Sequence, residues 1–298
     1  MLPAPMTIPR LVSRCELIPV RGLHYNVRHW GPMDAPAVFF LHGWMDTSAT
    51  FQFVVDALAR EWHVIAPDWR GYGASEWLGR AYWFPDFYAD LDALLAHYSP
   101  QRPALIVGHS MGASIAGSYA GVRPSRVARL VMMDFLGLAP SRAEEAPERL
   151  GSWLQDLGSR PELRRYPDHA ALAQRLRQAN PRLSAERAEF LSRAVSRTLA
   201  DGSVTMACDP WHRVPAPVRY HTEDVLACWR RIEAPVMNLI ADDGYVAARF
   251  GGETGELARR LACFADQRSV TVTDSGHNLQ HDQPTQAAAA IESFLVHG

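Results

Sequence analysis

Short apolar runs recur along the chain and alternate with longer amphipathic stretches. The runs lie at residues 37–41, 63–67, 104–107, 129–134, 236–241 and 269–273. Nearly continuous apolar runs of this length are typical of strands that are buried on both faces of a parallel sheet. Ahead of them, residues 11–21 and 23–30 are separated by Gly22, and this pattern predicts a hairpin.

Stretches with helical spacing lie between these runs. They cover about residues 50–60, 85–97, 112–122, 255–265 and 285–296. Alternating strands and helices predict an α/β fold with a mostly parallel sheet. Because the crossovers between parallel strands are right-handed, we expect helices on both faces of that sheet.

The segment 137–232 differs from the rest of the chain. Leu172, Leu176 and Ala179 form a helical apolar stripe, and Ser184 stands where a helix N-cap would, before an acidic first turn. Fifteen of the thirty arginines lie in this segment, and we interpret them as a solvated helix surface. We predict a helical cap over 137–232, inserted after the sixth strand between two parts of a core, 1–136 and 233–298.

The composition narrows the class of protein. Of the 298 residues, 48% are hydrophobic and 21% are charged, which excludes wholesale disorder. The net charge of −2 argues against a nucleic-acid partner. No apolar run approaches the roughly 18 residues of a membrane span. Prolines at positions 3, 5 and 9 interrupt an N-terminus that does not look like a signal peptide, so we expect a cytoplasmic protein. We also expect a monomer or a homodimer.

Neither a metal nor a cofactor is expected. The four cysteines, Cys15, Cys208, Cys228 and Cys263, lie far apart and form no CxxC pair. The chain contains no lysine, which excludes Schiff-base chemistry, a Ser–Lys dyad and a Walker A loop. A dinucleotide fingerprint is also missing, because no third glycine follows the glycines at 71 and 73 at the required spacing.

The strongest local signal for chemistry is the pentapeptide Gly-His-Ser-Met-Gly at residues 108–112. It follows an apolar strand and precedes a helix rich in small residues, which is the context that a G-x-S-x-G elbow needs. Glycines two positions before and two after Ser110 allow the tight turn that exposes a serine hydroxyl. This arrangement predicts that Ser110 is a nucleophile.

A serine nucleophile needs a base and an orienting carboxylate. His277 lies in a glycine-bearing loop after the last predicted strand, at the edge of the sheet where ligands bind in open α/β folds. Asp242 and Asp243 close one predicted strand, and Asp134 closes another. All three aspartates therefore stand at strand ends from which a carboxylate could reach the base.

Two backbone N–H groups are needed to hold the oxyanion. The first is expected from Met111, directly after the nucleophile. The second is expected from the loop after the third strand, His42-Gly43-Trp44, and we predict the N–H of Trp44.

Four stretches together resemble the α/β-hydrolases, in their capped, meta-cleavage-hydrolase-like branch. They are FLHGW at 40–44, PDWRGYGAS at 67–75, GHSMG at 108–112 and DSGHNLQHDQP at 274–284. Within that branch, HGWMD, DGSVTMACDP and ACWRRIEAPV are most similar to the serine hydrolase-like proteins. The resemblance covers most of the chain outside the cap. It implies an α/β-hydrolase fold with a mostly parallel eight-stranded sheet flanked by helices and a cap after strand six.

The resemblance favours Asp243 as the acid. The family often has a Gly-x-x-Asp pattern after strand seven, ahead of a Val-Pro pair. Here Ala241 replaces the glycine, and counting back three residues from Val246 gives Asp243. Asp242 and Asp134 stay open as alternatives, because some relatives carry the acid after strand six.

The same resemblance implies a serine hydrolase that works through an acyl-enzyme. Aromatic residues cluster where a pocket would form, and they favour a carboxylic ester or thioester with a hydrophobic acyl group as the substrate. Ser110 replaces the aspartate nucleophile of haloalkane dehalogenases and epoxide hydrolases, which favours acyl chemistry. We expect a small-molecule substrate in a pocket lined by His42, Trp83, Phe135 and Trp153. Two alternatives remain: a C–C bond hydrolase of the meta-cleavage type, and a non-catalytic binding protein on the same fold.

Overall fold

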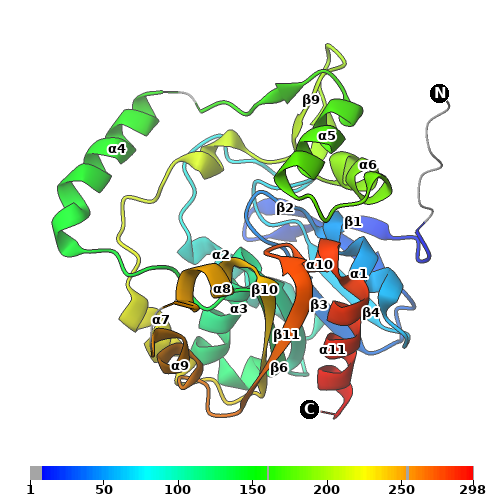
Figure 1. The fold of residues 1–298 in the computed structure, drawn as a ribbon, viewed down its shortest axis with the longest axis vertical. Helices are drawn as coiled ribbons and strands as arrows, with labels where there is room; N and C mark the ends of the chain where they lie inside the picture. Colours follow the sequence, from blue (N-terminus) through cyan, green and yellow to red (C-terminus); the bar gives the residue numbers. More distant parts are fainter. Residues whose placement is uncertain (1–8, 160, 253–254, 298) are drawn as a thin grey trace.

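A sheet of eight strands forms the centre of the computed structural model, which describes residues 9–159, 161–252 and 255–297 (Figure 1). The strands follow the order β1-β2-β4-β3-β5-β6-β10-β11. β1 and β2 form the predicted hairpin, β2 also pairs antiparallel with β4, and the other neighbours pair in parallel. The bounds are β1 Arg14–Val20, β2 Leu23–Trp30, β3 Ala37–Leu41, β4 His63–Pro67, β5 Ala104–His109, β6 Val127–Met133, β10 Val236–Asp243 and β11 Gln267–Gly276.

Helices cover both faces of the sheet because successive strand residues point to opposite faces. In β3, Val38 and Phe40 pack with one layer of helices, α1 (Gln52–Ala57) and α11 (Pro284–His297). Phe39 and Leu41 face the other layer, α2 (Pro85–Tyr98) and α3 (Met111–Val122). All four side chains are at most 1% exposed. The α/β prediction, with a mostly parallel sheet flanked by helices, is confirmed.

Two short helices in the second part of the core were not predicted. They are α8 (Tyr245–Phe250), directly after β10, and α10 (Leu279–Asp282), directly after the loop that carries His277. Helices of six and four residues give only a weak periodic apolar signal. Helix α9 (Glu256–Leu261), which also has six residues, lies within the predicted stretch 255–265. The prolines at positions 3 and 5, cited above against a signal peptide, lie outside the described residues.

The insertion between β6 and β10 contains more than helices. Its α4 (Ala146–Gly158), α5 (His169–Ala179) and α6 (Ala185–Ala194) are joined by a small sheet of β7 (Arg165–Tyr166), β9 (Val204–Met206) and β8 (Ser196–Thr198). Its last helix, α7 (Thr222–Trp229), packs on α3 of the core. A Cβ atom on Gly121 of α3 would lie only 1.8 Å from the carbonyl oxygen of Cys228, so glycine is required there. The predicted range 137–232 therefore includes a helix that packs with the core.

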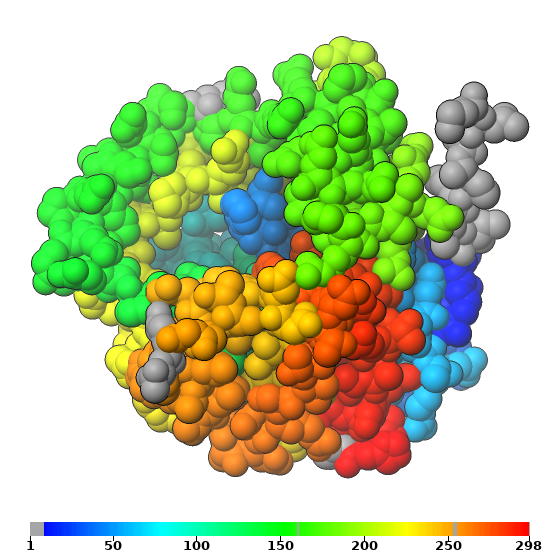
Figure 2. Space-filling view, in the orientation of Figure 1, coloured from blue at the N-terminus to red at the C-terminus, as the bar shows by residue number. Residues whose placement is uncertain are grey.

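The parts of the cap differ in how they meet the core. α5 and α6 pack over Phe53, and Thr47 Oγ1 donates a hydrogen bond to the carbonyl oxygen of Ala194 at 2.9 Å. In contrast, α4 buries none of its residues, and Leu150 and Leu154 are 44% and 62% exposed. The molecule is hollowed between α4 and the α5–α6 pair (Figure 2). None of the described helices is both long and apolar enough to cross a membrane.

Candidate active site

The turn between β5 and α3 holds Ser110 in a backbone conformation that side chains rarely adopt. Its φ is 52° and its ψ is −113°. Gly108 is required because a Cβ there would lie 2.6 Å from the backbone of the next helical turn, and Gly112 because a Cβ there would lie 2.1 Å from the carbonyl oxygen of Leu41. The two glycines therefore let the strand turn sharply into the helix, and the strained turn presents the serine hydroxyl.

A hydrogen-bonded chain runs from this hydroxyl across the ends of the strands. His277 Nε2 lies 2.9 Å from Ser110 Oγ, and His277 Nδ1 lies 2.8 Å from Asp134 Oδ2. An ionised carboxylate can only accept, so Nδ1 carries the proton and donates it to Asp134. Nε2 is then free to accept the proton of the serine hydroxyl. With 37% of its side chain exposed, His277 is accessible to a ligand.

Backbone N–H groups from the end of β10 and the start of α8 hold Asp134 in place. Its side chain is completely buried, Oδ2 accepts from Tyr245 N at 2.6 Å, and Oδ1 accepts from Ala241 N at 3.3 Å. Gly244 makes this approach possible, because a Cβ there would lie 2.4 Å from Asp134 Oδ2. Neither Tyr245 nor Gly244 was predicted to take part. The one sequence cue for them is the glycine that directly follows the two aspartates closing β10.

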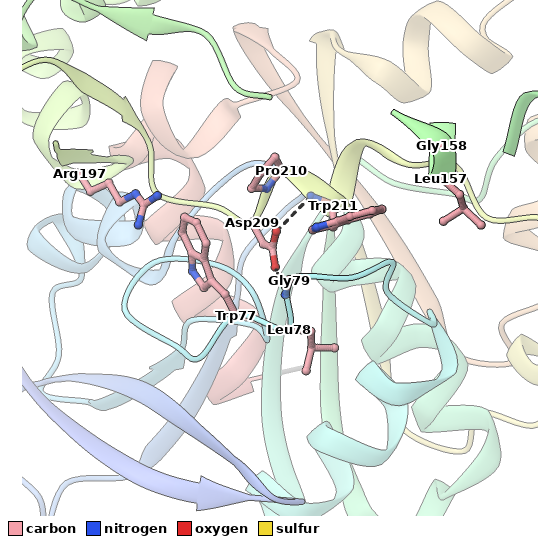
Figure 3. Close-up of a pocket in the computed structure, with 9 residues that line it drawn as sticks. All are labelled: Trp77, Leu78, Gly79, Leu157, Gly158, Arg197, Asp209, Pro210 and Trp211. Atoms are coloured by element: carbon pink, nitrogen blue, oxygen red, sulfur yellow. Dashed lines mark hydrogen bonds between the residues drawn. The ribbon is translucent and has the colours of Figure 1, made fainter. Parts of the chain in front are cut away.

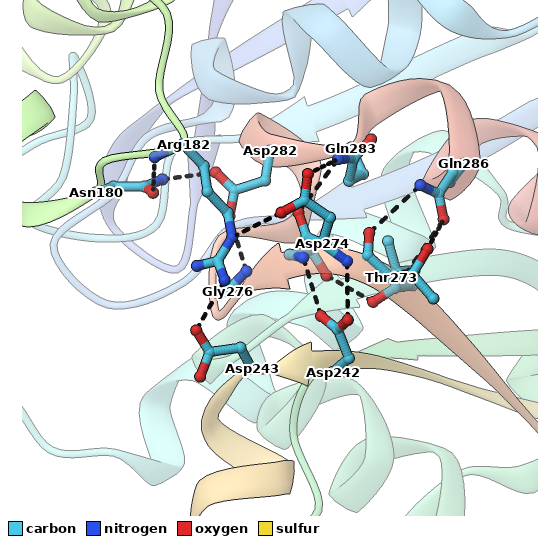
Figure 4. Close-up of polar contacts among 12 residues, drawn as sticks. Asn180, Arg182, Asp242, Asp243, Thr273, Asp274, Gly276, Asp282, Gln283 and Gln286 are labelled. Carbon is cyan, nitrogen blue, oxygen red and sulfur yellow. Dashed lines mark hydrogen bonds and ion pairs between the residues drawn. The ribbon is translucent and has the colours of Figure 1, made fainter.

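The geometry contradicts the prediction of Asp243 as the acid and favours the alternative, Asp134. The register between β10 and β11 shifts at the end of β10, between Ala241 and Asp243. Asp243 is 72% exposed there and pairs with Arg182 of the cap, with its Oδ2 2.8 Å from the guanidinium (Figure 4). Asp242, the other alternative, accepts from the N–H groups of Asp274 and Ser275 at 2.8 and 3.0 Å. These hydrogen bonds lower the pKa of Asp242 and engage both of its carboxylate oxygens.

The loop after β3 lies against the elbow, as the two predicted oxyanion donors require. A Cβ on Gly43 would lie 3.2 Å from Ser110 Cβ. Met111 is the first residue of α3, so its N–H has no partner within its own helix. Trp44 keeps 55% of its side chain exposed, and its indole N–H donates to the carbonyl oxygen of His212 in the cap at 3.4 Å. Trp44 therefore also connects this loop to the cap.

Buried titratable groups support the loops around the elbow. His42 is fully buried between Gly43 O at 2.8 Å and Trp69 N at 2.9 Å, and burial lowers the pKa of His42 to about 4. His109 Nε2 donates to the carbonyl oxygen of His277 at 2.8 Å, and burial holds the pKa of His109 well below its usual range. Burial also raises the pKa of Asp46 to about 7. Because their pKa values are lowered, His42 and His109 are neutral at pH 7, and their hydrogen bonds hold the loops around the elbow in place.

The predicted pocket residues separate into different places. Phe135 stacks on Tyr245 at 6.1 Å, and the Tyr245 ring lies 5.9 Å from that of His277, so Phe135 does lie beside the site. His42 cannot line a pocket because none of it is exposed, so that prediction is corrected. Trp83 is half exposed just ahead of α2. Trp153 lies on α4, the helix that stands apart from the core.

A cleft of about 660 Å³ lies between the core loop 77–79, the end of α4 and the cap segment 209–211 (Figure 3). Arg197 lies over the ring of Trp77 at 4.1 Å, and Asp209 accepts from Gly79 N at 2.8 Å. The lining includes neither Ser110 nor His277. Among the described residues, no group of three His, Cys, Asp or Glu side chains is arranged to hold a metal ion.

Comparison with known proteins agrees with this architecture. A family model described as the alpha/beta hydrolase fold matches residues 36–284. A serine hydrolase-like protein of Danio rerio is 28% identical over 275 residues, covering 89% of this chain and 83% of the relative. The 3-hydroxybutyrate-oligomer hydrolase of Cupriavidus necator is 29% identical over 298 residues, covering 96% and 98%.

Solved structures agree as well. The thioesterase domain from the curacin biosynthetic pathway superposes with a TM-score of 0.83 at 27% identity, covering 95% of this chain and 99% of that domain. The family match spans most of the chain, and the resemblance to α/β-hydrolases and serine hydrolase-like proteins inferred from the sequence motifs is confirmed. The chain belongs to the α/β-hydrolase fold family and is a hydrolase.

Proposed function

We propose that this hydrolase cleaves carboxylic esters or thioesters with a hydrophobic acyl group, through an acyl-enzyme on Ser110. The observation that carries the proposal is the hydrogen-bonded chain Ser110–His277–Asp134, with its 2.9 and 2.8 Å contacts. Nucleophile, base and orienting acid are the three parts that acyl transfer to water needs. A thioesterase domain and a 3-hydroxybutyrate-oligomer hydrolase among the similar proteins support the same reaction class.

In the proposed reaction, Ser110 Oγ attacks the carbonyl carbon as His277 Nε2 takes the hydroxyl proton. The N–H groups of Met111 and Trp44 stabilise the oxyanion. His277 then gives its proton to the departing alcohol or thiol, and the acyl group stays on Ser110. A water molecule, deprotonated by His277, attacks the acyl carbonyl carbon. The bond to Ser110 Oγ then breaks as His277 returns the proton to this oxygen, and the carboxylic acid is released. Asp134 keeps the imidazole in the required tautomer and stabilises the imidazolium that forms twice in the cycle.

Apolar side chains beside the hydroxyl support a hydrophobic acyl group. Phe135 and Tyr245 stack next to His277, and Met111, directly after Ser110, is partly buried against the core. Aromatic rings and flexible thioethers make a lining that suits alkyl or aryl chains of different shapes. Among the residues that the structure describes, Asp134 is the one fully buried charge that contacts His277, and the base already uses it.

The test is labelling with a fluorophosphonate, read out by intact mass, on the wild type and on Ser110→Ala. One adduct on the wild type and none on Ser110→Ala is the expected result. A panel of p-nitrophenyl and acyl-CoA esters then reports the preferred acyl group, with Ser110→Ala as the background.

Two results would overturn the proposal. A folded wild type that takes no adduct and turns over no ester would favour a binding protein on this fold. Turnover of a meta-cleavage dienoate without ester turnover would favour the C–C hydrolase.

A further inference from the structure

Polar side chains of the cap contact the segment that carries His277 (Figure 4). This segment, residues 276–278 at the junction of β11 and α10, is called the base loop below. Arg182 lies between α5 and α6; its guanidinium is 2.8 Å from Asp243 at the end of β10 and 3.3 Å from Asp274 in β11. A Cβ on Gly276 would lie 3.6 Å from Arg182 Nη1. The guanidinium therefore lies against the residue that directly precedes His277.

The backbone on the N-terminal side of His277 is held by carboxylates that the cap in turn contacts. Gly276 N donates to Asp282 Oδ2 at 2.8 Å, and Asn180 Nδ2 of the cap donates to Asp282 Oδ1 at 2.6 Å. Arg187 of α6 donates to the carbonyl oxygens of His281 and Asp282 at 2.8 and 3.1 Å. Cap and base loop therefore form one continuous hydrogen-bonded unit.

Charged and titratable groups face His277 from every element around it. Its ring contacts Ser110 and Asp134, and its carbonyl oxygen accepts from His109. Around the base loop there are more aspartates than arginines, and the arginines are Arg182 and Arg187. The other groups are Tyr245 beside the ring, Asp46 in the loop after β3, Asp242 and Asp243 on β10, and Asp274 and Asp282 next to the base loop.

We propose that Arg182 is a positioning residue for the reaction proposed above. Its ion pairs connect the cap to the strand ends beside the base loop, and its positive charge partly neutralises the negative charge of the aspartates around this loop. The inference rests on the proposed function, because it assigns Arg182 a role through His277. It also gives Asp243 a role: the carboxylate at the strand end where the family often carries its acid is here the anchor of the cap.

The test compares Arg182→Gln and Arg182→Lys with wild type, and takes Arg193→Gln as the matched control. Arg193 lies in the same part of the cap and pairs with Glu189 at 2.7 Å, on its own helix α6. The first readout is the titration midpoint of His277, followed by NMR of ¹³C-histidine-labelled protein and assigned with His277→Gln. The second is kcat and KM for an ester that the wild type turns over.

Loss of the guanidinium leaves an excess of negative charge beside the base, which favours the imidazolium. We expect Arg182→Gln to raise the His277 midpoint by about half a pH unit and to lower kcat about tenfold, with a smaller change in KM. Arg182→Lys keeps the charge and is expected to restore most of both effects. Arg193→Gln is expected to behave as wild type.

An unchanged midpoint in Arg182→Gln, with or without a lower melting temperature, would overturn the inference, because a purely structural contact does not move the titration of His277. An equal shift in Arg193→Gln would do the same. The NMR midpoint needs no turnover. A wild type without ester hydrolysis therefore overturns the proposed function and still leaves the effect of Arg182 measurable.

Discussion

Asp134→Asn is the substitution that decides between the two possible acids. In the wild type, Oδ2 of Asp134 accepts from both Tyr245 N at 2.6 Å and His277 Nδ1 at 2.8 Å. The amide group of an asparagine would meet a backbone donor in either orientation: Tyr245 N at 2.6 Å in the Oδ2 position, or Ala241 N at 3.3 Å in the Oδ1 position. The longer contact costs less, which favours the orientation that keeps the carbonyl oxygen in the Oδ2 position. In this orientation the tautomer of His277 is retained, and the substitution removes mainly the negative charge.

The size of the effect follows from that lost charge. Asp134 is completely buried, and its charge lies about 4 Å from that of the imidazolium. At an effective dielectric constant of about 20, this pair contributes about 4 kcal/mol to the transition state, or about a thousandfold in rate. We expect kcat to fall by about this factor with little change in KM, because the charge acts once the imidazolium has formed.

The assay is steady-state hydrolysis of an activated ester by Asp134→Asn and by Asp243→Asn, each checked for folding by circular dichroism and thermal melting. Asp243 is 72% exposed and pairs with Arg182, so its loss should cost less than about tenfold. A thousandfold loss in Asp243→Asn with near-normal activity in Asp134→Asn would refute the reasoning.

Two further predictions concern stability. Ser110→Gly should melt about 2–4 °C above Ser110→Ala, since both lack the hydroxyl and only glycine relieves the strain of a positive φ; equal melting temperatures in calorimetry would contradict this. The pKa of Asp46 is raised to about 7 from 3.8, so the folded state holds the proton more tightly than the unfolded chain. Its contribution to stability is therefore complete below about pH 4 and is lost as the pH rises through 7. Asp46→Asn should then gain about 3 kcal/mol of stability relative to wild type between pH 5 and pH 8 in urea titrations; the same difference at both pH values would show that Asp46 does not titrate in this range.

The sequence predicts the parts of the site that depend on local patterns. The glycines at 108 and 112 mark the elbow, because close backbone approach allows nothing larger there. The choice of acid depends on side-chain direction instead. Asp134 and Asp243 both close strands, and only the register shift at the end of β10 turns Asp243 outward. That shift leaves no pattern of apolar and polar residues, so a rule of spacing selected an aspartate that pairs with Arg182, whereas His277 contacts Asp134. The cap's small sheet was missed for a related reason, since strands of two and three residues carry no periodic signal.

The ends of β5 and β6 have a consequence for how the protein can diversify. His109 pairs with Met133, and the residues that follow them, Ser110 and Asp134, both take positive φ values of 52° and 46°. The spacing between Ser110 and Asp134 is therefore set by two adjacent strands, while the end of β10 and the start of α8 hold the Asp134 carboxylate in place. The insertion begins within a few residues of Asp134. Evolution can lengthen, replace or recombine this segment, and so change which substrates are accepted, without altering the separation of the two residues.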